Sequence, residues 1–173
     1  MRIIILVGPK HSGKTAAGRA LASILGCEFT DLDDLVTERC GKTPRALYAE
    51  GPLVFREAEA AALAAFIREK ADHVPVRVMA AGGGIIDNPG AMAVLERIKE
   101  AVFVYLDISA QAAWERISRA GELPPFLAGE NPRETHRLLH ERRAEAYRRF
   151  TPLVVEAGDR NPEEIAAEII SII

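Results

Sequence analysis

The sequence predicts a three-layer α/β/α domain in which helices cover both faces of a five-stranded parallel sheet. Segments typical of strands and of helices alternate along the chain about five times, which favours parallel strands joined by crossover helices. The runs 2–7 and 101–107 are almost continuously apolar, as expected for strands that are covered on both faces. The chain has 173 residues, 49% of them hydrophobic, and can therefore bury one domain core with little room for a second.

The expected strands are short, apolar and rich in β-branched residues. They span 2–7, 27–32, 76–81, 101–107 and 153–156. The expected helices carry apolar residues at helical spacing, and several begin with a proline that follows a capping residue. They span 14–25, 34–40, 44–50, 52–70, 89–100, 132–150 and the segments after Ser109 and Asn161. Ser109 and Asn131 are expected to cap the helices that follow them.

The composition argues against several classes of protein. A net charge of −3 provides no basic field for nucleic acid, and no apolar run approaches the ~20 residues that span a bilayer. The apolar run 2–7 continues into Gly8-Pro9-Lys10 without a small-residue cleavage site, so it is interpreted as a strand and not as a signal peptide. Cys27 and Cys40 lack metal-ligand spacing, and Cys40 and Trp114 are expected in the core. We expect a cytoplasmic protein that binds neither nucleic acid nor membranes.

Residues 8–15, Gly-Pro-Lys-His-Ser-Gly-Lys-Thr, match the phosphate-binding motif G-x-x-x-x-G-K-[ST] at every required place. A buried strand precedes the motif and a helix follows it. This context favours a phosphate loop over the alternative, an accidental glycine-rich turn. Backbone N–H groups and the helix N-terminus favour an anion here, while Lys14 can reach the β- and γ-phosphates and Thr15 can ligate Mg²⁺. The sequence therefore predicts binding of a purine nucleoside triphosphate with Mg²⁺. The expected nucleotide contacts are Gly8, His11, Ser12, Gly13, Lys14, Thr15 and Ala16.

Two aspartates follow the second expected strand, at the edge of the sheet where the phosphate loop also lies. In an extended chain Asp31 and Asp33 face the same way, so both can serve one site. One carboxylate can hold Mg²⁺, and the other can orient or deprotonate an acceptor hydroxyl. The alternative is that Asp33 or Asp34 only caps the next helix. We take Asp34 as the cap, which leaves Asp31 and Asp33 for chemistry.

Three further features stand out on the acceptor side. Gly82, Gly83 and Gly84 follow the third expected strand, where they either let a backbone approach a ligand or form a simple turn. Arg56 and Arg143, judged by position alone, are solvated surface arginines, because most arginines are exposed.

These features together resemble the shikimate kinase family over nearly the whole chain. The shared motifs, in order, are the phosphate loop, Asp31-x-Asp33, Phe55-Arg56-x-x-Glu59, Gly82-Gly83-Gly84 and Arg143-x-x-x-Tyr147. The resemblance implies a P-loop kinase with a nucleoside monophosphate kinase-like fold. It also implies transfer of the ATP γ-phosphoryl group to the shikimate 3-hydroxyl, a step of aromatic amino acid biosynthesis.

The resemblance also implies a role for each matching residue. Thr15 and Asp31 would serve Mg²⁺, and Asp33 would bind the reacting hydroxyl and act as the base beside Lys14. Arg56 and Arg143 would hold the substrate carboxylate, which suits the planar fork of arginine.

Other parts of the family pattern match more loosely. Backbone groups of residues 82–84 would contact the substrate, with Gly83 as a donor, and Arg116 and Arg160 would flank the adenine. Arg160 is alternatively a plain turn residue.

The expected lid, about 119–131, departs from the family. Shikimate kinases carry an arginine in an Arg-Pro-Leu-Leu stretch that reaches the transferring phosphates, and Pro124 stands at that place here. An arginine at a transferred phosphoryl group can change the rate by orders of magnitude. Either Arg119 or an arginine near Arg133 replaces it, or the lid meets a different acceptor, or catalysis is weak.

We therefore expect a single P-loop kinase domain, 1–173, with a substrate-binding segment at about 33–70. ATP and Mg²⁺ are the expected cofactors, a small hydroxylated carboxylate the expected substrate, and a monomer the expected state. One alternative is a kinase for another acceptor such as gluconate. A nucleoside monophosphate is disfavoured because Asp33 would repel its phosphate. The other alternative is a regulatory module that binds ATP without kinase activity.

Overall fold

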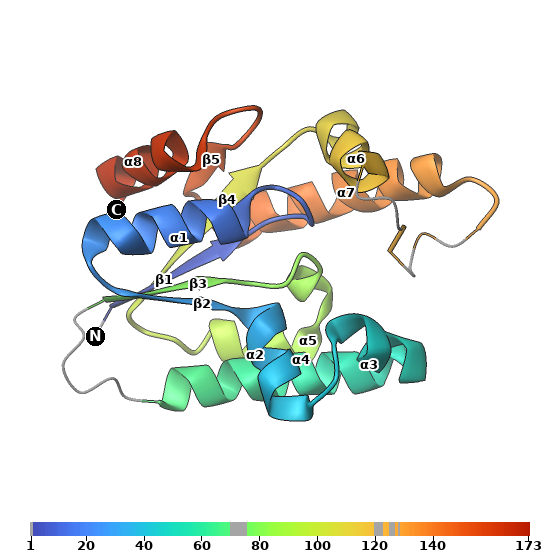
Figure 1. Ribbon diagram of the computed structural model, residues 1–173, viewed down its shortest axis with the longest axis horizontal. Coiled ribbons are helices and arrows are strands. Elements are labelled where there is room, and N and C mark those ends of the chain that lie inside the picture. The colour runs from blue at the N-terminus through green and yellow to red at the C-terminus, as the bar shows by residue number, and fades with distance from the viewer. Residues whose placement is uncertain (1, 70–75, 120–122, 125–126, 128) are drawn as a thin grey trace.

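A parallel sheet runs through the centre of the molecule, with helices on both faces (Figure 1). The computed structural model describes residues 2–69, 76–119, 123–124, 127 and 129–173. Within these residues the sheet has five strands in the order β2-β3-β1-β4-β5. The strands are β1 (Arg2–Val7), β2 (Glu28–Asp31), β3 (Val76–Ala80), β4 (Ala101–Asp107) and β5 (Val154–Glu156).

The central strand β1 determines where a ligand can bind. It pairs in parallel with β3 on one side and with β4 on the other, with Ile4 opposite Val78 and Val102. The chain thus moves to one side of β1 for β2 and β3, and to the other side for β4 and β5. In open α/β sheets such a reversal leaves a crevice outside the carboxyl ends of the strands.

Two layers of helices bury the two faces of the sheet. Because side chains alternate along a strand, Ile4 and Leu6 pack on one face, while Ile3, Ile5 and Val7 pack on the other. The first face is covered by α1 (Lys14–Leu25) and α8 (Pro162–Ile172). The opposite layer contains α2 (Leu32–Cys40), α3 (Pro44–Glu50), α4 (Pro52–Arg68), the 3₁₀ turn η1 (Ile85–Asp87), α5 (Pro89–Leu95) and α7 (Pro132–Phe150). Helix α6 (Ala110–Arg119) packs on α7.

The predicted α/β architecture is confirmed, and most elements lie within a residue or two of their predicted bounds. Ser109 Oγ accepts from the Ala112 N–H at 3.1 Å, and Asn131 Oδ1 from the Glu134 N–H at 3.4 Å, so both predicted caps are confirmed. The helix predicted over 89–100 was too long. It ends at Leu95, because the chain must turn before Ala101 pairs with Ile3.

Two side chains, Cys40 and Trp114, were expected in the core. Cys40 is exposed, so its predicted place in the core was wrong, and Cys27 and Cys40 are both free thiols. Trp114 is half-buried, with its ring centroid 5.6 Å from that of His136. None of the helices in the described part of the chain combines the length and apolar character needed to cross a bilayer.

Candidate active site

The phosphate loop joins β1 to α1 at the carboxyl edge of the sheet. Gly8 has a φ of 143°, and a Cβ there would lie 2.6 Å from the Leu106 carbonyl oxygen, so only glycine fits. His11 has a φ of 64°, an uncommon value for a residue with a side chain. Gly13, at φ 94°, precedes the first turn of α1. The chain thus curls around the N-terminus of a helix, as the motif predicts.

Lys14 is held inside this loop. Its Nζ donates to the carbonyl oxygens of Gly8 at 2.9 Å and Pro9 at 2.7 Å, and the residue is 8% exposed. Burial lowers the pKa of Lys14 to about 8, although Asp33 and Asp31 act in the opposite direction. A phosphate that enters the loop would bring negative charge to this lysine and favour its protonated form.

Thr15 and Asp31 meet directly beside the loop. Thr15 Oγ1 donates to Asp31 Oδ2 at 2.7 Å, so two hard oxygen atoms lie side by side. This pair fits Mg²⁺, which usually takes one or two carboxylates together with substrate phosphates and waters. Among the described residues there is no group of three or more His, Cys, Asp or Glu that could hold a metal by itself.

The predicted cap of the second helix was wrong. Asp31, and not Asp34, caps α2, because its Oδ1 accepts from the Asp33 N–H at 3.0 Å. Strand β2 ends at Asp31 and the helix begins at Leu32, so Asp33 lies in a helical turn and not in the extended chain that we expected. Both carboxylates nevertheless act on Lys14.

Arg116 connects three segments around the expected adenine site. Its guanidinium donates to the His11 carbonyl oxygen at 2.9 Å and also to the Gly158 carbonyl oxygen, and it lies 3.8 Å from the Asp159 carboxylate. The structure thus places Arg116 beside the phosphate loop, and its role at the adenine stays a prediction.

Arg160 lies in the same loop but is used differently. It donates to the carbonyl oxygens of Glu156 at 3.1 Å and Glu164 at 3.2 Å, and it forms an ion pair with Glu168. These contacts fix the start of α8. They correspond to the alternative that Arg160 is a turn residue.

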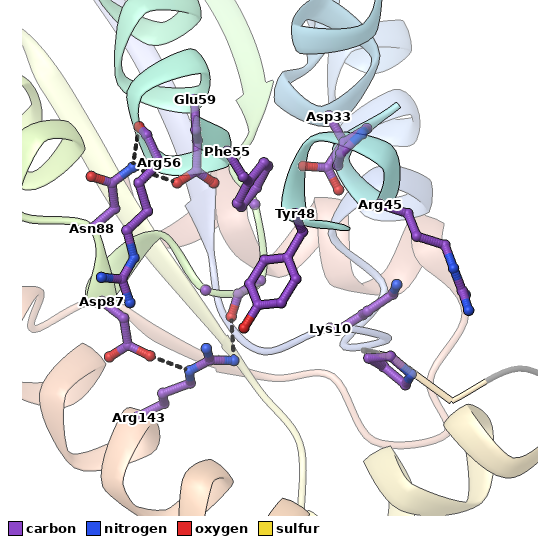
Figure 2. Close-up of a pocket in the computed structure, with 15 residues that line it drawn as sticks. Lys10, Asp33, Arg45, Tyr48, Phe55, Arg56, Glu59, Asp87, Asn88 and Arg143 are labelled. Carbon is purple, nitrogen blue, oxygen red and sulfur yellow. Dashed lines mark hydrogen bonds and ion pairs between the residues drawn. The ribbon is translucent and has the colours of Figure 1, made fainter. Parts of the chain in front are cut away.

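A cavity of about 200 Å³ lies next to the phosphate loop (Figure 2). This is small beside the ~300–1,000 Å³ of typical ligand pockets, which favours a small substrate. Asp33, Arg56, the three glycines and Arg143 all line this cavity, although they come from separate elements. Its full lining is Lys10, Asp33, Pro44, Arg45, Tyr48, Phe55, Arg56, Glu59, Gly82, Gly83, Gly84, Asp87, Asn88, Pro124 and Arg143. We call this the acceptor cavity.

The two arginines enter the acceptor cavity from α4 and α7 (Figure 2). Arg143 Nε donates to Asp87 Oδ2 at 2.7 Å, and Arg142 donates to the same oxygen at 2.8 Å from outside. Burial alone would raise the pKa of Asp87, but the hydrogen bonds from Arg142 and Arg143 hold this pKa below its ordinary value. Arg56 is exposed at the mouth of the cavity. The resulting wall can receive an anion.

The glycine run 82–84 lies in close contact with other segments of the protein, and at Gly83 the close contact is with backbone. A Cβ on Gly82 would lie 2.3 Å from Glu59 Oε1, and one on Gly83 would lie 2.6 Å from the Lys10 backbone nitrogen. On Gly84 it would lie 2.9 Å from Arg143 Nη2. The Ile85 N–H donates to the Gly82 carbonyl oxygen at 3.1 Å, so the segment does form a turn, and this turn also touches the phosphate loop, α4 and α7.

The half-buried carboxylate of Asp33 and the buried carboxylate of Glu59 both line the acceptor cavity. Burial, reinforced by Asp31, raises the pKa of Asp33, while Lys14 and Lys10 act in the opposite direction. Burial raises the pKa of Glu59 to about 7, with a hydrogen bond from Asn88 Nδ2 at 2.8 Å acting against it. A carboxylate with a raised pKa is a better proton acceptor at neutral pH.

Sequence reasoning missed several residues of this cavity. Glu59 was part of a recognised motif but received no role, and Asp87, Asn88 and Tyr48 were not considered. The pair Asn88-Pro89 is a signal of a helix start, and Asn88 does cap α5, but its Nδ2 also binds Glu59. No sequence signal links Asp87 to Arg143, because their contact spans 56 residues.

The lid is described only in part, since residues 120–122, 125–126 and 128 lie outside the described residues. Pro124 lines the acceptor cavity. Arg119 is 80% exposed and lies 3.9 Å from Glu115, and Arg133 donates to Gln111 at 2.8 Å. Neither arginine is among the residues that line the cavity.

A phosphate loop at the central strand, opening onto a small cavity that holds carboxylates and arginines, defines a P-loop kinase that acts on a small molecule. The family model for shikimate kinase matches residues 10–173. The chain belongs to the shikimate kinase family.

Individual relatives agree with this assignment. A shikimate kinase of Aromatoleum aromaticum is 32% identical over 96% of this chain and 91% of the relative. One of Mycobacterium tuberculosis is 35% identical over 96% of this chain and 90% of the relative. The solved shikimate kinase from Acinetobacter baumannii in complex with shikimate has a TM-score of 0.85 at 31% identity, covering 99% of this chain and 92% of that one.

More distant structures share the fold alone. A gluconokinase from Sinorhizobium meliloti has a TM-score of 0.63 at 20% identity, covering 98% of this chain and 90% of that one.

Proposed function

We propose that this protein transfers the γ-phosphoryl group of ATP to the 3-hydroxyl of shikimate, giving shikimate 3-phosphate. The observation that carries the proposal is the composition of the acceptor cavity, which has the Asp33 carboxylate on α2 and the guanidinium groups of Arg56 and Arg143 on α4 and α7. Shikimate is both an alcohol and a carboxylate, so its hydroxyl suits Asp33 and its carboxylate suits the two arginines. The solved relative from Acinetobacter baumannii holds shikimate, which supports this choice of acceptor.

On the donor side, the residues of the phosphate loop would bind the triphosphate. Backbone N–H groups and Lys14 would hold the β- and γ-phosphates, with Arg116 beside the base. Thr15 and Asp31 would hold Mg²⁺, which in this position neutralises charge on the phosphates. Arg160 would contribute by shaping the loop 157–160.

On the acceptor side, Asp33 would accept the hydroxyl proton as the oxygen attacks the γ-phosphorus. Its raised pKa brings it closer to the working pH of a base. Arg56 and Arg143 would hold the carboxylate, and backbone groups of residues 82–84 would fix the ring between them. The proposal also includes a monomeric protein. It further includes a location in the cytoplasm, where the free thiols of Cys27 and Cys40 would stay reduced.

The test is ADP release from MgATP with shikimate, quinate, gluconate or a nucleoside monophosphate as acceptor. We expect a saturable rate with shikimate alone. Asp33→Asn should lower the turnover number by about 10²–10⁴-fold while ATP binding is retained, because it removes the base. Asp34→Asn is the matched control, since Asp34 is exposed on the same helical turn, and should change turnover less than about twofold.

The panel also separates the alternatives. A response to gluconate in place of shikimate would keep the kinase and reject the acceptor. ATP binding without phosphorylation of any member would favour a regulatory module.

A further inference from the structure

We infer that Lys10 is a catalytic residue whose ammonium group stabilises the negative charge on the phosphoryl group during its transfer. This inference rests on the proposed function, since it names the side chain that meets the transferring group. It also names a cation that would replace the family's lid arginine, at whose place this chain has Pro124.

The location of Lys10 carries the first part of the argument. Of the described residues that line the acceptor cavity, Lys10 alone comes from the phosphate loop. A phosphoryl group that moves from ATP to the acceptor must cross from this loop into this cavity. Lys10 therefore lies at the boundary that the transferred group has to cross.

The backbone of Lys10 is fixed while its side chain is free to reach. A Cβ built on Gly83 would lie 2.6 Å from the Lys10 nitrogen and 3.1 Å from its Cβ, so the loop packs tightly on the end of β3. The residue itself is exposed. In Figure 2 the Lys10 side chain is drawn between Arg143 and Arg45, below Asp33 in this view. A fixed backbone that carries a long side chain suits a contact that forms only when substrates are bound.

The electrostatic effects of Lys10 on its neighbours support a role at the transferring phosphoryl group. Lys10 lowers the pKa of Lys14 and of Asp33, so its charge reaches both the phosphate loop and the expected base. Arg143 is engaged with Asp87 and with the Gly83 carbonyl oxygen at 3.4 Å, at the end of the cavity assigned to the carboxylate. A cation at Lys10 would thus favour the ionised form of Asp33 as well as the charged phosphoryl group.

The arginines that the sequence offered for this role lie elsewhere. Arg119 points from α6 into solvent beside Glu115, and Arg133 lines a second cavity between α6 and α7. Pro124, which does line the acceptor cavity, has no charge.

In the transfer, the bond between the γ-phosphorus and the oxygen that bridges to the β-phosphorus breaks as the acceptor oxygen bonds to the γ-phosphorus. The hydroxyl proton goes to Asp33, and the electron pair of the broken bond leaves on ADP. Lys10 donates hydrogen bonds to the non-bridging oxygens and exchanges no proton. Hydrogen-bond donors at this place act where charge spreads in the transition state.

The first experiment compares Lys10→Met with Lys10→Arg in the shikimate-dependent assay. We expect Lys10→Met to lower the turnover number by about 10²–10³-fold, with dissociation constants for ATP and shikimate within about threefold of the wild type. Lys10→Arg should stay within about tenfold, because it keeps the charge. Lys42→Met, which removes an exposed lysine paired with Glu50 outside the cavity, should leave turnover within about twofold.

The second experiment supplies a cation from the lid. Adding Pro124→Arg to Lys10→Met should recover at least about tenfold of the lost turnover, because residue 124 lines the same cavity. Turnover of Lys10→Met within threefold of the wild type would overturn the inference. So would a loss confined to the KM for shikimate, or a large loss in Arg119→Ala or Arg45→Ala with none in Lys10→Met. A wild type that shikimate does not stimulate would instead reject the proposed function.

Discussion

The donor half of this site is built from consecutive residues, whereas the acceptor half is assembled from distant ones. The loop 8–15 needs one strand before it and one helix after it, and its buried Lys14 bonds to the loop's own carbonyl oxygens at Gly8 and Pro9. The acceptor cavity takes its walls from α2, α3, α4, α7, the segment around Gly83 and the segment around Pro124. A local motif can therefore be recognised from the sequence, whereas a cavity assembled from distant segments can be identified only in the tertiary structure.

The two halves also handle charge differently. The donor half encloses the ammonium group of Lys14, whose positive charge the phosphates of the nucleotide would neutralise. The acceptor half already contains its own counter-charges, with Asp87 between Arg142 and Arg143 and with Glu59 within the influence of the Arg143 and Arg56 charges. The donor half is therefore expected to govern turnover together with the base Asp33, and the rest of the acceptor half is expected to govern substrate affinity and the pH dependence of stability.

Among the variants that compare the two halves, the largest expected effect is at Lys14 in the donor half. Lys14→Met should lower the turnover number by about 10³-fold, because it removes the buried cation that meets the phosphates. Shikimate affinity, measured by calorimetry, should stay within about threefold if the two halves are independent. Arg19→Met, a change at an exposed position of the same helix, is the control. An equally large loss of shikimate affinity in Lys14→Met would contradict the division between the halves.

A smaller effect is expected at the carboxylate end of the acceptor cavity. Arg143→Ala should raise the KM for shikimate about 10- to 100-fold with little change in ATP affinity, since a charged hydrogen bond contributes about 1.5–3 kcal/mol. Steady-state kinetics with each substrate varied in turn is the measurement.

Arg142→Ala is the matched control for this change. Arg142 binds the same Asp87 oxygen, but its side chain is 60% exposed and that of Arg143 is 14% exposed. We expect its KM for shikimate to change less than about threefold. Equal effects of the two variants would mean that Asp87 positioning, and not contact with the substrate, is what Arg143 provides.

The smallest effect on turnover, but a clear one on stability, is expected at Glu59. Its pKa is raised to about 7 in the folded chain, so between about pH 4.5 and 7 the folded state binds more protons than the unfolded state. The free energy of unfolding should therefore fall as the pH rises through this window, by on the order of 3 kcal/mol at most. Glu59→Gln should remove this fall. Urea unfolding at pH 5, 6, 7 and 8 tests it, and parallel profiles for the two proteins would show that Glu59 does not titrate in this window.

The helix pattern shows why sequence reasoning succeeds locally and fails at junctions. Local chemistry marks the start of α7 at Asn131-Pro132, as predicted, and Gly26 follows directly after the predicted helix 14–25 as its C-cap. Asp31 was assigned to chemistry alone, yet it also caps α2, because a carboxylate with two oxygens can serve Thr15 and a backbone N–H together. The sequence contains no sign of such shared use.

The sequence by itself determined the alternating fold, the phosphate loop and the family, because these depend on periodicity and on contiguous residues. Only the tertiary structure decided that Asp87 holds Arg143, that Asn88 binds Glu59, and that Gly83 packs on Lys10. Those contacts join segments that are far apart in the chain, and each depends on how the layers pack around the carboxyl edge of the sheet. Burial there also raises the pKa values of Asp33 and Glu59, which no residue type reveals on its own.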